Sequence, residues 1–411
     1  MTVEQMQQKQ QALHHPDFAD HREQALLEQV IALRPLLRSE AREGERNRTM
    51  TDKVFRALCE LDIWWLLLPR RWGGRGLSSA AFSRINREIA RGDPSVAWVV
   101  QIINGTTWIS SLTADALQRD LFGDGPVRIC SSFATTGTAT PVDGGYIING
   151  EWTYNSGCRQ ADWGQYLVNI VHPDGSVSPG NFAYVPMKDV RIVDTWYCAG
   201  LQGTSSHSAH IADQFIPEHH MLLGTKPAGT HILDQTLFGE PSDYWPTMPL
   251  IRSAGLGLLV GAAEGALELA IETAHQRSVP NTSYKRQADS SVIQHHLGEA
   301  ASKIKTAWTL AQHASTTLDR LALAREVADL AVRADTKSQA SMAVKLLTEA
   351  LDTLMFGAGS SAFLLDNPLQ RFWRDLNVAA RHAIYNPDVG FEIYGRELLG
   401  VQPNIVPSAV I

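Results

Sequence analysis

The sequence contains few of the residues that would mark a secreted, metal-rich or nucleic-acid-binding protein. Its 411 residues include only four cysteines, Cys59, Cys130, Cys158 and Cys198, and none of them forms a Cys-x-x-Cys pair. Such spacing favours reduced thiols over a disulfide framework. Asp and Glu (43) outnumber Lys and Arg (36), so the net charge of -7 provides no general attraction to nucleic acid or to anionic membranes.

Further absences concern membranes, export and metals. No run of about 18 apolar residues occurs, so no membrane span is expected. The segment Met1 to Gln11 is polar and Gln-rich and has no signal-peptide core, which predicts a cytoplasmic location. The pairs His219-His220 and His295-His296 are adjacent, so their side chains should diverge, and no metal site is expected.

Hydrophobic periodicity divides the chain into zones. Residues 1–125 show helical spacing of apolar positions, and residues 126–222 carry short β-type runs separated by turns, which predicts a β-barrel or sandwich. Residues 223–249 are rich in Gly and Pro and are expected to form a linker or irregular segment. Residues 250–411 contain four long patterns typical of a four-helix bundle.

Local signals refine these zones. Helix starts are predicted at Thr51 or Asp52, at Ser78 and at Asp93-Pro94. A hairpin turn is predicted at Asp143-Gly144. The expected strands are residues 127–133, 145–148, 165–171, 182–185 and 190–193.

A polar corner follows the predicted hairpin. Ser156 stands beside Gly157, where a small hydroxyl and an unhindered backbone can approach a flat ligand. Trp152, Tyr154 and Trp163 could form apolar walls around it. The alternative is an ordinary hairpin with aromatic residues in its core.

Several motifs together resemble the acyl-CoA dehydrogenase fold. They are Trp65-Leu66-Leu67-Leu68-Pro69 with Trp72-Gly73-Gly74, the segment from Asp194 to Ser206, and Arg371-x-x-Arg374-Asp375. The stretch from Trp152 to Trp163 resembles the flavin-dependent monooxygenase branch of that superfamily, with Tyr154 where the branch usually has Phe. The resemblance implies an α+β multidomain protein with an N-terminal helical domain, a middle β domain and a C-terminal four-helix bundle.

The expected base of an acyl-CoA dehydrogenase is missing. Desaturation of an acyl thioester needs a carboxylate to remove the α-proton, and the family usually has a Glu shortly after the Arg-Asp pair. Here that segment is Ala383-Ile384-Tyr385-Asn386-Pro387, and Asp388 stands in a different context. The loss argues for oxygen chemistry.

The branch therefore implies the oxygenase component of a two-component monooxygenase. Such a protein uses reduced flavin and O2, through a flavin hydroperoxide, to oxygenate a small aromatic or heteroaromatic substrate. Reduced FMN is expected, with reduced FAD as the alternative. The implied partners are a separate NAD(P)H-dependent flavin reductase and further copies of the chain in a homotetramer. The alternatives are an acyl-CoA dehydrogenase-type flavin dehydrogenase and an N-oxygenase of an amine.

The resemblance also implies roles for individual residues. The implied catalytic group is Ser156, which holds the proton on flavin N5, His382, which stabilises charge or transfers a proton, and Ser131. The implied cofactor-binding group is Ser156, Trp98, Ser131, Ser132, Thr204, Ser205 and Arg277, the last holding a flavin phosphate across a subunit boundary. Simpler readings compete with several of these roles: a turn cap for Ser156, a bundle histidine for His382, core packing for Trp98 and a surface helix end for Arg277.

The substrate pocket is expected to include Trp98, Asn104, Trp108 and His207. Phenol hydroxylases of the branch often have a histidine about a turn or two beyond the tryptophan at Trp98, but this chain has the segment Asn104 to Trp108 there. His207 or His210 could replace it, or the substrate could be an indole, a thiophene, a polyketide ring or an amine that needs no deprotonation.

Overall fold

The computed structural model describes residues 22–224, 239–406 and 411. Its first part is helical. Side-chain caps open three of these helices, because the oxygens of Thr51, Ser78 and Asp93 accept backbone N–H groups that have no helical partner. These caps confirm the predicted starts. The helices are α2 (Arg22–Asn47), α3 (Asp52–Glu60), α4 (Ser79–Gly92), α5 (Pro94–Ser110) and α6 (Asp115–Phe122).

The middle part is one seven-stranded sheet, ordered β5-β6-β2-β1-β3-β4-β7. The predicted hairpin is confirmed, since Val142 pairs with Gly145 and Gly144 has a φ of +76°. The first and third strands run parallel, and the other neighbours are antiparallel. The strands are β1 (Ile129–Val142), β2 (Gly145–Trp152), β3 (Trp163–Val171), β4 (Val177–Pro186), β5 (Arg191–Val193), β6 (Ser208–Pro217) and β7 (Met221–Leu222).

Strand β6 was not predicted from the sequence. It pairs along β2 from Gly145 to Trp152 and also binds β5. Its sequence, Ser-Ala-His-Ile-Ala-Asp-Gln-Phe-Ile-Pro, has only two β-branched residues and includes Ala, Asp and Pro, which are depleted in strands, so propensity gives a weak signal. Its position in the sheet comes from pairing with β2, which is a long-range interaction.

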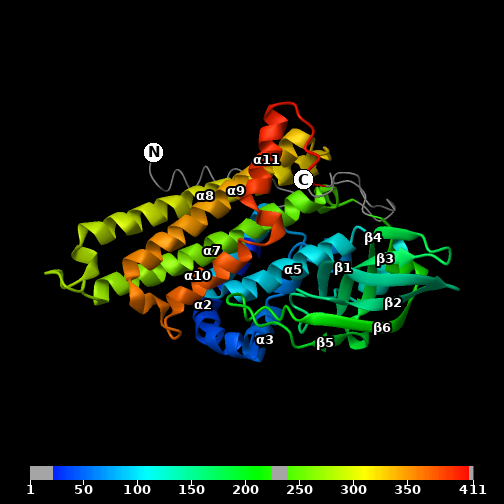
Figure 1. Cartoon of the computed structure of the whole chain (residues 1–411), viewed down its shortest axis with the longest axis horizontal. Helices are drawn as coiled ribbons and strands as arrows, with labels where there is room; N and C mark the ends of the chain where they lie inside the picture. The colour runs from blue at the N-terminus through cyan, green and yellow to red at the C-terminus, as the bar shows by residue number, and fades with distance from the viewer. Residues whose placement is uncertain (1–21, 225–238, 407–410) are drawn as a thin grey trace.

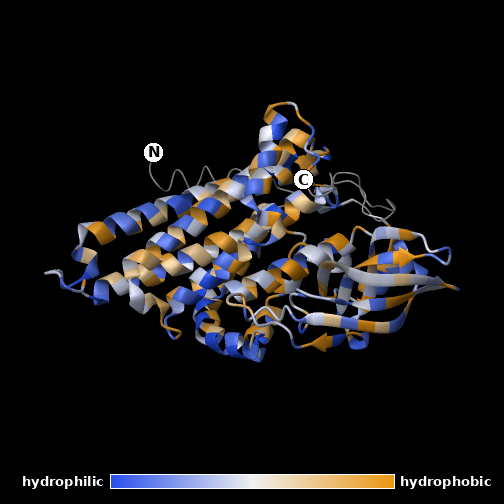
Figure 2. Cartoon of the chain, viewed as in Figure 1, coloured by the Kyte–Doolittle hydropathy of each residue, from blue (hydrophilic) through white to orange (hydrophobic). Residues whose placement is uncertain are grey.

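The third part is the helical bundle. Figure 1 shows its long helices side by side, with α5 between the bundle and the sheet. Helix α5 contacts both α7 and β1. In Figure 2 the lower edge around α3 is mostly hydrophilic. The helices are α7 (Thr247–Gln276), α8 (Ser291–Ala324), α9 (Leu330–Ala358), α10 (Pro368–Ala379) and α11 (Pro387–Leu398). This order of helices, sheet and bundle confirms the predicted fold class.

Helix α7 is the central helix of the bundle. By length and composition alone it could cross a membrane, but most of its apolar stretch is buried inside the protein. A methyl group at Gly257 would lie 2.2 Å from the carbonyl oxygen of Ser83, and one at Gly261 would lie 2.1 Å from that of Arg87. These glycines therefore let α7 pack directly on the backbone of α4, so this Gly-rich run has a packing role.

This contact predicts that Gly257→Ala destabilises the protein. The added methyl has no space beside Ser83, so we expect the free energy of unfolding to fall by about 1–3 kcal/mol, the usual range for overpacking. The measurement is chemical unfolding followed by circular dichroism. Gly298→Ala on α8 is the control, because nothing lies within 4 Å of a methyl there, and helix propensity predicts a small gain. Equal effects of the two substitutions would contradict this account of the α4–α7 contact.

Candidate active site

The corner after β2 is held against the segment that precedes β6. The backbone N–H of Asn155 donates to the His207 carbonyl at 3.2 Å, and that of Gly157 donates to the Thr204 carbonyl at 2.8 Å. Tyr154 and Gly157 both have positive φ values, of 57° and 76°. The tight turn between them places the Ser156 side chain inside the protein, where it is only 7% exposed.

A row of hydrogen-bonded side chains begins at Trp98 on α5. Its indole Nε1 donates to Ser156 Oγ at 3.1 Å. Ser156 Oγ lies 2.7 Å from Ser206 Oγ, which lies 2.6 Å from Thr204 Oγ1. Thr204 Oγ1 in turn donates to the carbonyl oxygen of Leu201 at 2.8 Å. All four side chains are buried.

The last member of this row fixes the direction of every hydrogen bond in it. A carbonyl only accepts, so Thr204 gives its single hydroxyl hydrogen to Leu201. Ser206 must then donate to Thr204, and Ser156 must donate to Ser206. Because the Trp98 indole only donates, Ser156 Oγ retains one lone pair and no hydrogen for a ligand.

Helix α10 fixes the loop in which this row ends. The backbone N–H of Leu201 donates to Asp375 Oδ1 at 2.6 Å, and the guanidinium of Arg374 donates to the carbonyl of Ala199. A methyl at Gly200 would lie 2.5 Å from the Arg374 carbonyl. The Arg-Asp pair recognised in the sequence therefore holds the backbone that sets the direction of the hydroxyl row.

Asp375 is an unusual carboxylate. It is fully buried, and Ser95 Oγ lies 3.4 Å from its Oδ2. Burial, together with the nearby charge of Asp93, raises the pKa of Asp375 to about 7. Burial also raises the pKa of Asp93 to about 6, and the guanidinium of Arg371 opposes both shifts.

His382 lies on the other side of Trp98. The two ring centroids are 5.4 Å apart at an interplanar angle of 62°. Desolvation by the surrounding protein lowers the pKa of His382, which favours the neutral ring, although the residue is still exposed to solvent. Its Nδ1 accepts the backbone N–H of Ile384 at 3.4 Å, and this assigns the ring proton to Nε2, which can donate to a ligand.

Two further predicted residues lie close to this corner. Ser132 Oγ donates to the carbonyl of Thr153 at 2.7 Å, inside the turn that carries Ser156. Ser131 Oγ lies 3.0 Å from Thr106 Oγ1 on α5. The structure thus brings both predicted β1 serines to the interface between the sheet and α5.

His207 is fully buried beside the hydroxyl row. Its Nδ1 lies 3.3 Å from Asp194 Oδ1, and burial lowers the pKa of its imidazole. Its Nε2, like Oδ1 of the buried Asn155, has no hydrogen-bond partner in the described part of the chain. Buried polar atoms without partners are costly, so both atoms favour a polar ligand at this corner.

Other predicted residues have different surroundings. The Asn104 amide makes four hydrogen bonds to main-chain groups, so it has no hydrogen-bonding capacity left for a substrate. Trp108 is fully buried and donates to the Ser242 carbonyl at 3.0 Å. Ser205 has a positive φ of 50°, which suits the glycine common at this motif position, and its hydroxyl donates to Thr49 rather than to the row.

Arg277 lies apart from the corner. It caps the C-terminal end of α7, and this end of the helix lies away from the sheet (Figure 1). Its guanidinium donates to Ser361 Oγ at 2.6 Å. Large exposed apolar side chains flank Ser361 in the sequence. They are Phe356, Phe363, Leu364 and Leu365, and each is at least half exposed. Within one protomer the structure does not bring Arg277 to Ser156.

The histidine pair on the β domain corrects one expectation. The side chains of His219 and His220 do not diverge, because the Nε2 atoms of both lie within hydrogen-bond distance of Asp120 Oδ2, at 2.7 and 2.9 Å. The short 3-10 turn Glu218–His220, which is not a regular helix or strand, allows this convergence. Hydrogen bonds to Asp120 on α6 therefore hold both imidazole rings.

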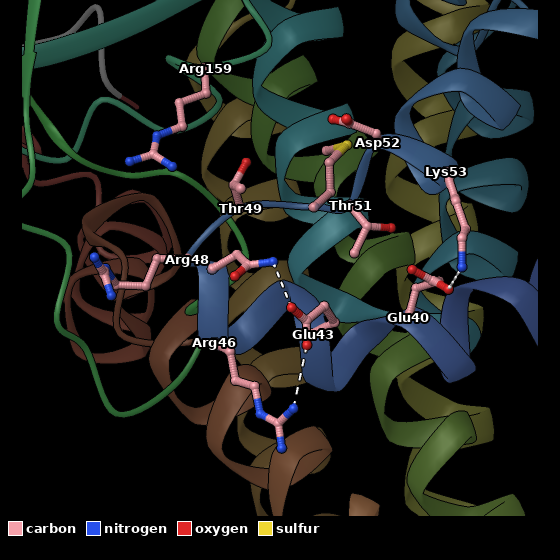
Figure 3. Close-up of a pocket in the computed structure, with 11 residues that line it drawn as sticks. Glu40, Glu43, Arg46, Arg48, Thr49, Thr51, Asp52, Lys53 and Arg159 are labelled. Carbon is pink, nitrogen blue, oxygen red and sulfur yellow. Dashed lines mark hydrogen bonds and ion pairs between the residues drawn. The ribbon is translucent and has the colours of Figure 1, made fainter.

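A cavity of about 690 Å³ opens beside the N-terminal helices, and Figure 3 shows the charged residues that line it. Most of its cations are paired, as Arg46 is with Glu43 and Lys53 with Glu40. Arg159, three residues after Ser156, also lines this cavity. The cavity therefore gives a polar surface to the outer side of the corner.

Ser206 has no role predicted from the sequence, although it is the last residue of the segment from Asp194 to Ser206 that resembles the acyl-CoA dehydrogenase fold. That final serine of the motif was the available signal. It was passed over because the motif shows which residues recur but not which hydroxyls touch.

Comparisons with known proteins show which family the chain belongs to. The chain matches the family models "Acyl-CoA dehydrogenase, N-terminal domain" over residues 23–121 and "Acyl-CoA dehydrogenase, C-terminal domain" over residues 256–387. It is 31% identical to the flavin-dependent monooxygenase oxygenase subunit HsaA of Mycobacterium tuberculosis, over 92% of this chain and 96% of that protein. It is 30% identical to a pigment production hydroxylase of a Rhodococcus species, over 90% and 95%. The solved structure of XiaF from Streptomyces, in complex with FADH2 and glycerol, superposes with a TM-score of 0.88 at 31% identity, covering 94% of this chain and 97% of XiaF.

The raised pKa of Asp375 predicts a pH-dependent stability. A carboxyl whose pKa is higher in the folded state stabilises the protein fully below its unfolded value of 3.8, and this contribution is lost as the pH rises through about 7. Asp375→Asn keeps an oxygen for the Leu201 N–H but cannot ionise. We therefore expect the melting temperature of the variant, relative to the unmodified protein, to increase between about pH 5 and about pH 8.

The measurement is thermal unfolding across that pH range, with Asp366→Asn at an exposed position as the control. A difference between variant and unmodified protein that stays constant with pH would show that Asp375 does not titrate as assigned.

Proposed function

Since this chain belongs to the oxygenase subunits of flavin-dependent monooxygenases, within the acyl-CoA dehydrogenase family, we propose that the corner at Ser156 is its flavin-reacting site. The protein is the oxygenase component of a two-component system that hydroxylates an aromatic substrate with reduced flavin and O2. A separate reductase supplies the reduced flavin. We place this system in the cytoplasm, where NAD(P)H is available to the reductase.

The observation that carries the proposal is the direction of the hydroxyl row. Reduced flavin has an N–H at N5, whereas oxidised flavin has a lone pair there. Ser156 Oγ can only accept a further hydrogen bond, because its own hydrogen is committed to Ser206. The residues present therefore fit a reduced ring better than an oxidised one.

When bound, reduced flavin supplies the electrons that activate O2 for insertion of one oxygen atom. The protein residues would hold the proton at N5 and keep water away from it. Ser156 retains the proton at N5 by accepting its hydrogen bond, and Trp98 fixes the Ser156 side chain by donating to it. The neutral His382, with its proton on Nε2, donates to an oxygen of the ring or substrate. Burial of the row keeps water from the proton that Ser156 holds.

The finer assignment concerns the flavin and the assembly. We propose reduced FAD as the preferred flavin, supported by the FADH2 complex of XiaF. We also propose a homotetramer in which the apolar side chains beside Ser361 are covered by another copy of the chain. In that arrangement Arg277 would meet a flavin phosphate bound to a neighbouring subunit.

We expect the Ser156→Ala variant to release hydrogen peroxide sooner than the unmodified protein after reduced flavin has reacted with O2. The variant loses the only acceptor proposed for the N5 proton, so we expect hydrogen peroxide release to be faster by about tenfold, the usual worth of one hydrogen bond. Anaerobic protein with reduced FAD is mixed with O2, and peroxide is measured over time without substrate. Ser111→Ala is a control, since that buried hydroxyl donates to a helix carbonyl outside the row. Unchanged peroxide release would remove Ser156 from this role.

Ser206→Ala should weaken the preference for reduced flavin. Without Ser206 the Ser156 hydroxyl is free to rotate and donate, so it can serve the lone pair of oxidised flavin as well. We expect the ratio of dissociation constants, oxidised over reduced, to fall by several-fold. Equilibrium binding of both redox forms under anaerobic conditions measures this ratio, again with Ser111→Ala beside it. An unchanged ratio would contradict the assigned direction of the row.

A further inference from the structure

Three metal-ligating side chains converge on the β domain, outside the candidate active site. They are the imidazoles of His219 and His220 and the carboxylate of Asp120. The histidines lie in the 3-10 turn between β6 and β7, and Asp120 lies on α6. One ligand atom from each residue lies within 4.8 Å of the other two, and no other such group of three occurs among the described residues.

The convergence of two adjacent histidines is unusual. Neighbouring residues on a regular helix or strand point in different directions. The pair His295-His296 on α8 follows this rule, because its ring centroids are 6.2 Å apart and only His295 approaches Glu299 in the described part of the chain. In the pair His219-His220 the centroids are 4.6 Å apart, and both rings face one carboxylate.

The distances in this cluster are close to those that a zinc ion needs. Nε2 of His219 and Nε2 of His220 lie 2.7 and 2.9 Å from the same oxygen, Oδ2 of Asp120. Around a tetrahedral Zn2+ with bonds of about 2.0–2.1 Å, neighbouring ligand atoms stand about 3.3 Å apart, so each separation would open by only about 0.5 Å. Both His219 and Asp120 are exposed, so their side chains have space to move by that amount.

One ligand is held in advance by the sheet. His220 is buried, and its ring makes an edge contact with Trp163, the first residue of β3, at a centroid distance of 5.4 Å. Neither histidine uses Nδ1 in a hydrogen bond within the described part of the chain. The ring protons can therefore shift to Nδ1, which frees both Nε2 lone pairs for a metal.

We propose that Asp120, His219 and His220 bind one Zn2+ ion, with water at the fourth position, and that this ion ties α6 to the β domain. Two imidazoles and one carboxylate form a donor set that zinc accepts. Mg2+ and Ca2+ prefer oxygen ligands throughout, so two imidazole nitrogens select against them.

The ion adds a second link to a contact that is already apolar on its inner side. Leu117, Leu121 and Phe122 of α6 are buried in one cluster with Tyr184 of β4. Asp120 lies on the exposed side of the same helix, where α6 contacts the histidine turn. Because metal-free hydrogen bonds already join these groups, the fold does not depend on zinc, and the bound ion strengthens the attachment of α6.

Binding is tested by calorimetry on the full chain, purified without a polyhistidine tag. The protein is titrated with ZnCl2 and, in parallel, with MgCl2. We expect one zinc site per chain and an affinity for Mg2+ that is lower by about a hundredfold or more, since Mg2+ binds nitrogen ligands poorly. Equal affinities for the two ions would overturn the proposal.

Variants assign the zinc to this cluster. His219→Ala and Asp120→Ala should each weaken zinc binding by about tenfold or more, because each removes one of three protein ligands. His295→Ala is the matched control, since it also removes an exposed histidine from an adjacent pair. All three positions are exposed, so the variants should fold, which circular dichroism verifies. Zinc affinity that is unchanged in His219→Ala and Asp120→Ala would overturn the site.

Hydrogen exchange tests the tie to α6. Zinc should slow amide exchange in α6, Asp115–Phe122, in the unmodified protein and in His295→Ala but not in His219→Ala. Zinc binding without this protection would overturn the tie. None of these measurements involves flavin, so their failure would leave the proposed function in place.

Discussion

The candidate site depends on the carbonyl oxygen of Leu201, because a carbonyl can accept a hydrogen bond but cannot donate one. That residue has a left-handed backbone, with a φ of 53°, and its N–H is fixed by Asp375 on α10. Its carbonyl therefore has a defined position, and each hydroxyl from Thr204 to Ser156 must orient toward it. A bundle helix thus determines, through one loop, what a side chain at the edge of the sheet can offer a ligand.

The same bundle treats its buried charges in two ways. Where α4 packs on α7, Arg87 pairs with Glu264, and Arg91 pairs with Glu268. These partly buried cations have their counter-ions within the protein and stabilise the contact. Arg252, further toward the N-terminus of the same α7, instead donates to the main-chain oxygen of Ile411.

Much of the fold could be predicted from local patterns. Caps such as Ser78 and Asp93, the turn at Gly144 and the long bundle helices are encoded by neighbouring residues. Strand β6 was missed because its pairing with β2, rather than its own composition, makes it a strand. Sequence patterns therefore predict the elements whose formation depends mainly on neighbouring residues.

The site, like the fold, could be predicted only where local motifs carry the information. Motif resemblance identified Ser156, Trp98 and His382, which the structure brings together. It could not give the direction of the hydrogen bonds, which depends on a carbonyl 45 positions away from Ser156. The amide of Asn104, which was expected in the substrate pocket, is occupied by main-chain groups that lie about 40 residues earlier in the sequence, so no local pattern reveals this role.

The position of Arg277 has a consequence for catalysis at low protein concentration. Arg277 caps the C-terminal end of α7, which lies away from the sheet that precedes Ser156, so within one protomer the two residues are on different parts of the structure. If neighbours supply the missing cation, dilution would strip the cofactor as well as separate the subunits. Turnover per chain would then rise with concentration, and one defective copy would impair the copy beside it.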